Sequence, residues 1–267
     1  MIDVGRSIAA IPAADEPEAL HVAHALTSLV TAVVVIDDGS ATPLFSEPPI
    51  HVERFSHNRG YGDVVDHAIS YARFHDFDTL LFVDGDGQHD VQYVAPLLEC
   101  LQSADVAVGN RLHPTSPQVG VEQPAERRQA NDLFRALLRT AHPSFALGDF
   151  FCGFIAFRVD KIPSELDLKG SRYASPARMW PCLLGARLRC AEIPVPRIYW
   201  SAGEKFTRQY PNLPSLGEHL FDELATACER FLNQPRIRME NALRGELESG
   251  GYEAIRPWFQ GVLRPAG

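Results

Sequence analysis

Two aspartates that follow an apolar run are the residues best suited to chemistry. Residues 80–89 read LLFVDGDGQH, so four apolar residues lead directly into Asp84 and Asp86. On an extended backbone, residues two apart project to the same side. Two carboxylates there suit Mg²⁺ or Mn²⁺, which bind through a few protein oxygens and substrate phosphates. The alternative is a simple turn, because Asp and Gly both favour turns.

The elements around this segment alternate between apolar runs and helical patterns. Strands are expected over 7–11, 31–36, 51–55, 79–83 and 105–108, with helical patterns over 16–29, after 58–62 and over 91–102. This alternation predicts an α/β domain with a mostly parallel sheet. Such sheets bind ligands at the carboxyl ends of their strands. Asp84 and Asp86 are therefore expected at the ligand-binding edge.

The second half of the chain begins with a loop rich in proline, glutamine and serine over 112–124. Pro124 is well placed to start a helix. Beyond it we expect strands over 150–157 and 188–193, and helices over 215–233 and 236–248. The domain organisation that follows is an α/β domain over 1–210 and a helical extension over 211–267.

One helical pattern in the extension has an apolar stripe: Leu216, Leu220, Phe221, Leu224, Ala225 and Cys228. The stripe can pack on the core, pair with a second copy of the chain, or lie on a membrane. The opposite face lacks the lysine and arginine of a membrane-surface helix. Core packing or a homo-oligomer is therefore favoured.

Composition and charge exclude several classes of protein. The 267 residues are 45% hydrophobic, enough for a large core, and the formal net charge of −9 argues against nucleic acid as a partner. No apolar stretch approaches the length of about 20 residues that spans a bilayer, and residues 1–20 do not resemble a signal peptide. The odd number of cysteines, without a CxxC pair, indicates free thiols. We expect a cytoplasmic protein, with peripheral attachment to a membrane left open.

Several motifs follow one another in a characteristic order. They are PAADE at 12–16, VIDDGS at 35–40, NRGYG at 58–62, DGDGQH at 84–89, GNR at 109–111, DFFCGFIAFR at 149–158, IPV at 193–195 and GEKF at 203–206. Together they resemble the family 2 glycosyltransferases of the GT-A fold, especially the dolichyl- or polyprenyl-phosphate sugar synthases. The resemblance covers residues 7 to 207.

The resemblance implies a metal-dependent, inverting transfer of a hexose from a UDP- or GDP-sugar. The metal, Mg²⁺ or Mn²⁺, would be held by Asp86, Asp84 and Gln88. The donor would contact Pro12, Asp37, Arg59, Asp84 and Asp86. A carboxylate such as Asp37 can accept bonds from a base N–H or from ribose hydroxyls, and Asp38 reads as a turn residue. Arg59 before a helix suits an anion, with a solvated surface arginine as its alternative.

The acceptor side is less well defined. Asp149 occupies a position where a general base could take a proton from an acceptor hydroxyl, although an ionised phosphate acceptor needs no base. Arg127, Arg128 and Lys205 are the candidates for binding an acceptor phosphate. The resemblance favours a polyprenyl phosphate at the membrane surface, whereas the charge of −9 and the lack of membrane helices favour a soluble metabolite or protein acceptor.

Three departures from the family pattern bear on these expectations. Ala14 stands where an aromatic or polar residue is usual near the nucleotide base, Cys152 replaces a serine, and a serine is missing between Glu204 and Lys205. The last two changes fall on the acceptor side, so the sequence defines the identity of the acceptor less well than that of the donor. A sugar-1-phosphate nucleotidyltransferase ranks lower, because its glycine-rich loop is absent after the first strand. A non-catalytic nucleotide-sugar binder is the remaining alternative.

Overall fold

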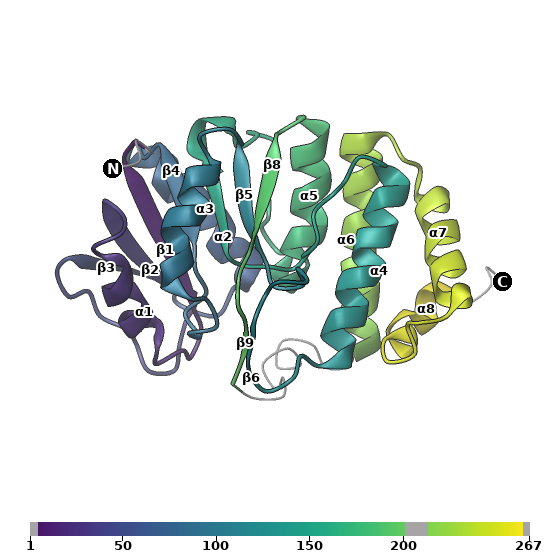
Figure 1. The fold of residues 1–267 in the computed structure, drawn as a ribbon, viewed down its shortest axis with the longest axis horizontal. Coiled ribbons are helices and arrows are strands. Elements are labelled where there is room, and N and C mark those ends of the chain that lie inside the picture. The colour runs from purple at the N-terminus through teal and green to yellow at the C-terminus, as the bar shows by residue number, and fades with distance from the viewer. Residues whose placement is uncertain (1–4, 201–212, 264–267) are drawn as a thin grey trace.

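The computed structural model describes residues 5–200 and 213–263, and is built around a seven-stranded sheet (Figure 1). The strand order is β3-β2-β1-β4-β7-β5-β8. The bounds are β1 Ser7–Ala13, β2 Ala32–Asp37, β3 Ile50–Arg54, β4 Thr79–Phe82, β5 Val106–Asn110, β7 Ile155–Arg158 and β8 Cys190–Pro194. The α/β fold and the mostly parallel sheet expected from the alternation are confirmed.

Strand β7 is the exception in direction. It runs antiparallel to both of its neighbours, β4 and β5. The sequence suggested a strand over 150–157, but the strand begins only at Ile155. Phe150 and Phe154 are buried without belonging to it, so the apolar character of 150–154 reflects loop packing rather than sheet pairing.

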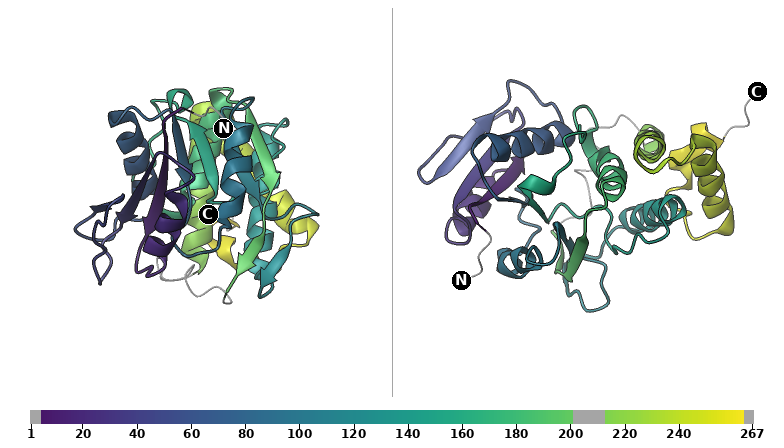
Figure 2. Two further views of the ribbon diagram at one scale, coloured as in Figure 1. Left: turned by 60° about the vertical axis from the view of Figure 1, so that its left-hand side comes forward. Right: turned by 90° about the horizontal axis from the view of Figure 1, so that it is seen from above.

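Helices cover both faces of the sheet (Figure 2). α1 packs on β1 and β2, α2 packs on β1 and β4 from the other face, and α3 packs on β5 and β8. Their apolar residues recur at helical spacing, which buries one face of each. The bounds are α1 Ala19–Leu26, α2 Tyr61–Phe74 and α3 Val94–Cys100.

Helices α4, α5, α6 and α7 lie together at the end of the molecule away from β3 (Figure 1). α6 packs along α5, and α7 packs along α4. α5 was not expected from the sequence, because Pro181 in its interior is a signal against a helix. The bounds are α4 Ala125–Ala141, α5 Ser175–Gly185, α6 Leu213–Leu232 and α7 Arg236–Ser249, followed by α8 Gln260–Leu263.

The apolar stripe of α6 belongs to the core. Each of its six residues is at most 1% exposed, and they join a hydrophobic cluster that extends through the sheet. The stripe is therefore not available to a second copy of the chain or to a membrane. The expected domain boundary at residue 210 lies outside the described residues. Within the part of the chain that is described, no helix is both long and apolar enough to cross a membrane.

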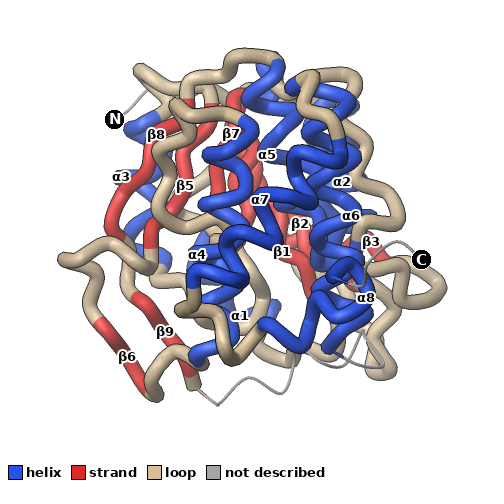
Figure 3. Tube along the Cα trace, turned by 90° about the vertical axis from the view of Figure 1, so that its right-hand side faces the viewer, coloured by secondary structure: helices blue, strands red, loops and turns tan. Residues whose placement is uncertain are grey.

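A small ribbon projects from the body below the sheet (Figure 3). β6 (Gln118–Gly120) pairs in parallel with β9 (Arg197–Tyr199). It occupies part of the 112–124 segment that the sequence predicted as a loop. At Gly120, whose φ is +75°, a Cβ would lie 2.1 Å from the carbonyl oxygen of Tyr199, so glycine permits the two strands to approach.

Candidate functional site

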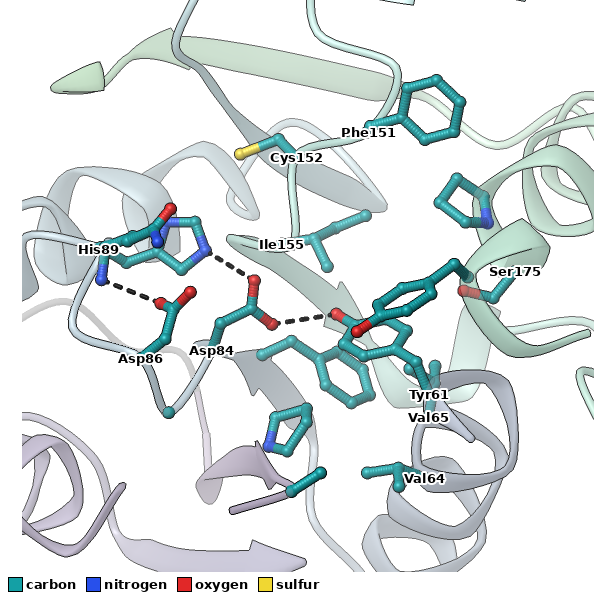
Figure 4. Close-up of a pocket in the computed structure, with 18 of the residues that line it drawn as sticks. Tyr61, Val64, Val65, Asp84, Asp86, His89, Phe151, Cys152, Ile155 and Ser175 are labelled. Atoms are coloured by element: carbon teal, nitrogen blue, oxygen red, sulfur yellow. Dashed lines mark hydrogen bonds and ion pairs between the residues drawn. The ribbon is translucent and has the colours of Figure 1, made fainter. Parts of the chain in front are cut away.

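A cavity of about 240 Å³ opens where β1 and β4 end. Its walls come from these strand ends, the start of α2, the 151–153 segment, α5, and single residues of α4 and β9 (Figure 4). Pro12, Asp84, Asp86 and Gln88, which the sequence assigned to the donor or the metal, all line it. The ligand-binding edge of the parallel sheet is therefore also the hollowed part of the molecule.

Asp84 lies at the centre of the cavity wall. Its Oδ1 accepts a hydrogen bond from the Tyr61 hydroxyl at 3.2 Å, and its Oδ2 lies 3.2 Å from His89 Nε2 (Figure 4). Burial raises the pKa of Asp84, but the hydrogen bonds from His89 and Tyr61 outweigh it and hold that pKa below its ordinary value. A Cβ on Gly153 would lie 2.4 Å from Oδ2, so glycine at this position lets the carboxylate fit.

Asp86 lies in the turn that follows. Its Oδ1 accepts the backbone N–H of Gln88 at 3.0 Å, which fixes the carboxylate beside the turn. Gly87 between them has a φ of +70°, a conformation that glycine adopts without strain. The alternation of acid and glycine thus builds a turn and presents carboxylates together, so the two readings of this segment are compatible.

His89 has a defined structural environment. Its side chain is 2% exposed, and its ring stacks on Phe154 with centroids 5.2 Å apart. The His89 ring that contacts Asp84 is therefore fixed by its burial and by its stacking on Phe154. His89, the last residue of the DGDGQH motif, thus helps to position the Asp84 carboxylate.

The two aspartates at the end of β2, Asp37 and Asp38, are placed differently from what the sequence suggested. Asp37 is fully buried and accepts the backbone N–H groups of Ser40 and Leu44 as well as the Arg54 guanidinium. Burial raises its pKa, but these hydrogen bonds outweigh that effect and lower it. Asp37 does not line the cavity, whereas Asp38 does. The geometry does not support the expected donor contact by Asp37, because its carboxylate is buried and is already bound by groups of the protein.

Asp38 instead joins two loops at the cavity wall. Its carboxylate oxygens accept the backbone N–H groups of Arg59 at 2.6 Å and of Gly60 at 2.8 Å. Burial raises the pKa of Asp38. The Arg59 side chain points elsewhere, with its guanidinium 4.5 Å from the Phe55 ring centroid and 3.2 Å from Asp63. The expected anion contact by Arg59 is therefore not supported, because the side chain does not line the cavity.

Asp149 forms a paired structure with Arg111. Arg111 Nε and Nη2 donate to the two Asp149 oxygens at 2.7 and 3.0 Å, and the Arg111 backbone N–H donates at 3.2 Å. The Asp149 side chain is 2% exposed and does not line the cavity, while Arg111 does. A general base must reach the proton that it removes. The expected base role of Asp149 is therefore not supported, and the carboxylate instead holds Arg111 at the cavity wall.

The three cations assigned to the acceptor differ in placement. Arg127 lines the cavity with its guanidinium 5.3 Å from the Tyr199 ring centroid. Arg128 is exposed and does not line the cavity. Lys205 lies outside the described residues. One helical turn thus supplies one arginine to the cavity and one to the surface.

Two of the positions at which this sequence departs from the family pattern lie in the cavity wall. Ala14 lines the cavity, and so does Cys152. Burial raises the pKa of the Cys152 thiol to about 12, so this thiol is neutral at ordinary pH. It lies at the opposite side of the cavity from Tyr61 (Figure 4).

Two tyrosines were missed by sequence reasoning. Tyr61 and Tyr173 stack with ring centroids 6.4 Å apart, and both line the cavity. Burial raises the pKa of Tyr173 to about 12. Tyr61 lies within the NRGYG motif, in which only Arg59 was considered as a binding residue. Tyr173 comes just before α5, a helix that the sequence did not predict.

The comparisons with known proteins agree with this geometry. The family model described as "Glycosyl transferase family 2" matches residues 10–162, more than half of the chain. The chain belongs to this family. An undecaprenyl-phosphate mannosyltransferase from Micrococcus luteus is 24% identical over 187 residues, which cover 64% of this chain and 74% of that protein. The resemblance seen in the motifs is thereby confirmed, and the chain is a glycosyltransferase.

Solved structures show the same fold. Glucosyl-3-phosphoglycerate synthase from Mycobacterium tuberculosis in complex with Mn²⁺, UDP and phosphoglyceric acid superposes with a TM-score of 0.60 at 15% identity, covering 84% of this chain and 79% of that one. A complex of that enzyme with Mn²⁺ and UDP-glucose gives 0.59 at 16% identity, with 86% and 80% covered. The fold is therefore GT-A, as the motifs implied.

Proposed function

We propose that this glycosyltransferase moves a hexose from a UDP- or GDP-sugar to the phosphate of an acceptor, with inversion at the anomeric carbon. The observation that carries the proposal is the arrangement of charge in one cavity, with Asp84 and Asp86 at the end of β4 and with Arg111 and Arg127 on other elements. Carboxylates suit a metal-bound diphosphate, and guanidinium groups suit a phosphate. One cavity therefore offers chemistry for both substrates.

The side chains near Asp86 fit a divalent cation. Asp86 and Gln88 supply oxygen donors of the kind that Mg²⁺ and Mn²⁺ prefer. Over residues 5–200 and 213–263, no three His, Cys, Asp or Glu side chains are grouped so that they could hold a metal ion by themselves. That donor set matches a cation held by few protein ligands together with a diphosphate. When bound, the cation would neutralise charge on the leaving nucleoside diphosphate.

Asp84 fits a separate role, because both of its oxygens already contact Tyr61 and His89. It stays ionised and can accept hydrogen bonds from donor hydroxyls. We keep Asp84 and Pro12 as donor contacts and add Asp38, which lines the cavity in place of Asp37. Ala14 beside them leaves room for the nucleotide.

On the acceptor side, Arg111 and Arg127 would bind the phosphate, with Arg111 oriented by Asp149. A phosphate oxygen would form the new bond to the anomeric carbon as the bond to the nucleoside diphosphate breaks and its electron pair leaves with the diphosphate. The attacking oxygen is already ionised and needs no base, which agrees with Asp149 being engaged elsewhere. The undecaprenyl-phosphate and phosphoglyceric acid in the names of the two relatives both carry phosphate.

Two acceptor classes share this chemistry. A polyprenyl phosphate is supported by the mannosyltransferase relative, and a soluble phosphorylated metabolite by the synthase relative. We propose the polyprenyl phosphate and keep the metabolite as the second candidate. A non-phosphorylated acceptor, such as a protein side chain, would need a base other than Asp149 and is ranked third.

Calorimetry against UDP and GDP, with and without Mn²⁺, tests the donor assignment. We expect one nucleotide to bind with Mn²⁺ and to bind at least tenfold more weakly after addition of a chelator. Asp86→Ala should remove the metal dependence, while Asp90→Ala, in the same loop but outside the cavity, should retain it. Binding of neither nucleotide under any metal condition would contradict the proposal.

A further inference from the structure

The turn that carries Asp86 is also contacted from outside the cavity. Trp200, which does not line the cavity, donates its indole N–H to the carbonyl oxygen of Gly87 at 3.3 Å. Gly87 lies between Asp86 and Gln88, the two residues whose side chains fit the cation. A side chain 113 positions away in sequence is therefore attached to the backbone of this turn.

The hydrogen bonds on the two sides of the turn share one peptide group. The carbonyl of Gly87 and the N–H of Gln88 belong to the same planar unit, and in a trans peptide they point in opposite directions. The N–H is bound by Asp86 Oδ1 at 3.0 Å, and the carbonyl is bound by the Trp200 indole. The contacts thus run from indole to peptide to carboxylate, and hydrogen bonds in such a chain polarise one another.

Glycine at position 87 makes this contact matter for the turn. Its φ of +70° is a conformation that glycine reaches easily, but glycine is also the residue with the widest backbone freedom. Around the place where a Cβ on Gly87 would lie, Trp200 Nε1 at 4.0 Å is the only atom of the described residues within 4 Å. On this side of Gly87, the indole is therefore the group in the described chain that can restrict the turn.

The ribbon of β6 and β9 holds the indole in place (Figure 3). Trp200 directly follows β9, and a Cβ on Gly120 of β6 would lie 3.6 Å from Trp200 Cε3. The preceding residue, Tyr199, is buried, and its carbonyl accepts the backbone N–H of Val121 at 2.8 Å. The backbone that leads to the indole is therefore fixed.

Burial does not explain why a tryptophan occupies position 200. Its side chain belongs to a residue that is 60% exposed, whereas Trp180 and Trp258 are each 1% exposed. An indole that stays largely in water gains little from the hydrophobic effect. Its N–H can only donate, and the acceptor is the carbonyl of the turn that carries Asp86. The contact points to a role in that turn.

We propose that Trp200 is a positioning residue for the cation: through the peptide group between Gly87 and Gln88, it holds the Asp86 carboxylate in the orientation that binds Mg²⁺ or Mn²⁺. This inference rests on the proposed function, in which Asp86 is a ligand of the cation. A ligand that is already oriented loses less conformational freedom on binding. The affinity for the cation is therefore the property that the indole N–H sets from outside the cavity.

Removal of the indole N–H tests the proposal directly. Trp200→Phe keeps an aromatic ring and deletes the donor. With UDP or GDP, whichever calorimetry selects, we expect Mn²⁺ to bind about fivefold more weakly in electron paramagnetic resonance titrations. A fivefold change corresponds to about 1 kcal/mol, the usual net contribution of one hydrogen bond. Nucleotide binding without metal should stay within twofold, whereas a general disturbance of the fold would weaken both.

The control for this variant is Phe74→Leu, because Phe74 is an exposed aromatic residue that does not line the cavity. It should change neither affinity. Unchanged Mn²⁺ affinity in Trp200→Phe, beside a wild type that binds the nucleotide with Mn²⁺, would overturn the inference and leave the proposed function standing. A wild type that binds neither nucleotide would overturn both.

A double variant shows whether Trp200 acts through Asp86. In an Asp86→Ala background, Trp200→Phe should cause no further loss of nucleotide affinity in the presence of Mn²⁺, because the carboxylate that the indole orients is already gone. A further fivefold loss would show that Trp200 acts independently of Asp86 and would overturn the inference.

Nuclear magnetic resonance of the free protein tests the chain of contacts without any ligand. The three tryptophans give three indole N–H signals, and Trp200→Phe identifies the signal of Trp200. We expect Asp86→Ala to shift this signal and to leave those of Trp180 and Trp258 in place, whereas Asp90→Ala should shift none. A Trp200 signal that Asp86→Ala does not move would overturn the inference. Thermal unfolding checks that each variant is folded. If Asp86→Ala does not fold, Mg²⁺ with the nucleotide should shift the Trp200 signal of the wild type, and an unmoved signal there would overturn the inference.

Discussion

Replacing Asp149 by asparagine separates a positioning role from a catalytic one. The Asp149 side chain is 2% exposed and that of Arg111 is 15% exposed, so the pair is largely shielded from solvent. Asparagine keeps the size but offers one neutral acceptor where the carboxylate offered two charged ones. Arg111 would then carry an uncompensated charge in a buried setting.

The expected loss of stability follows from this geometry. Breaking a buried ion pair by removing one partner costs about 3–5 kcal/mol. For a chain of this size, each kcal/mol lowers the melting temperature by about 2–4 °C, so a loss of about 3 kcal/mol predicts a fall of about 6–12 °C. Asp160→Asn is the control, because Asp160 pairs with Lys161 while its side chain is 57% exposed. That variant should melt within about 2 °C of the wild type.

Kinetics complete the test. Without its orienting carboxylate, Arg111 should bind the acceptor phosphate less well, so KM for the acceptor should rise while nucleotide affinity remains. A general base would behave differently, because its loss lowers kcat and leaves the melting temperature and the acceptor KM nearly unchanged. That second pattern in Asp149→Asn would refute the positioning role.

Three further predictions concern single residues. Arg127→Ala should raise KM for a phosphate acceptor about tenfold, because a hydrogen bond to a charged group contributes about 1.5–3 kcal/mol. Arg128→Ala is the control and should match the wild type. Equal effects of the two variants in steady-state kinetics would contradict the assignment of Arg127 to the acceptor. Gly153→Ala should weaken nucleotide binding in calorimetry at least tenfold, because the new Cβ would meet Asp84 Oδ2 at 2.4 Å, and unchanged binding would show that the carboxylate has room to move. The pKa of Asp105 is lowered from 3.8, chiefly by hydrogen bonds from its arginine partner, so its contribution to stability is present above pH 3.8 and is lost as pH falls through the lower folded pKa. Asp105→Asn should therefore flatten the decline in urea-unfolding stability below about pH 4, and an unchanged acid limb would exclude this carboxylate as a cause.

Much of the fold could be predicted because its signals are local. β1, β2 and β4 are short apolar runs that end in polar turns, and the acids after β4 mark the ligand-binding edge. The direction of β7 could not be predicted in the same way, because a buried strand reads alike in both directions. α5 could not be predicted in the same way, because Pro181 in its interior is a local signal against a helix.

The site was predicted less fully because its roles depend on partners distant in sequence. Nothing in the motif around Asp37 shows that Arg54 of the neighbouring strand neutralises it. The pairing of Asp149 with Arg111 likewise joins residues 38 positions apart. The placement of Asp84 and Asp86 could be predicted because the turn that positions them is formed by consecutive residues.

The place of β7 between β4 and β5 also constrains how the chain is assembled. β1 to β4 can pair as soon as residue 82 is available, but β5 has no neighbour among them and joins the sheet only through β7. A nascent chain that has not yet produced residues 155–158 therefore carries an unpaired edge on β4, of the kind that promotes association between chains. Synthesis of residues 155–158 is thus the event that covers the edge of β4 and joins β5 to the rest of the sheet.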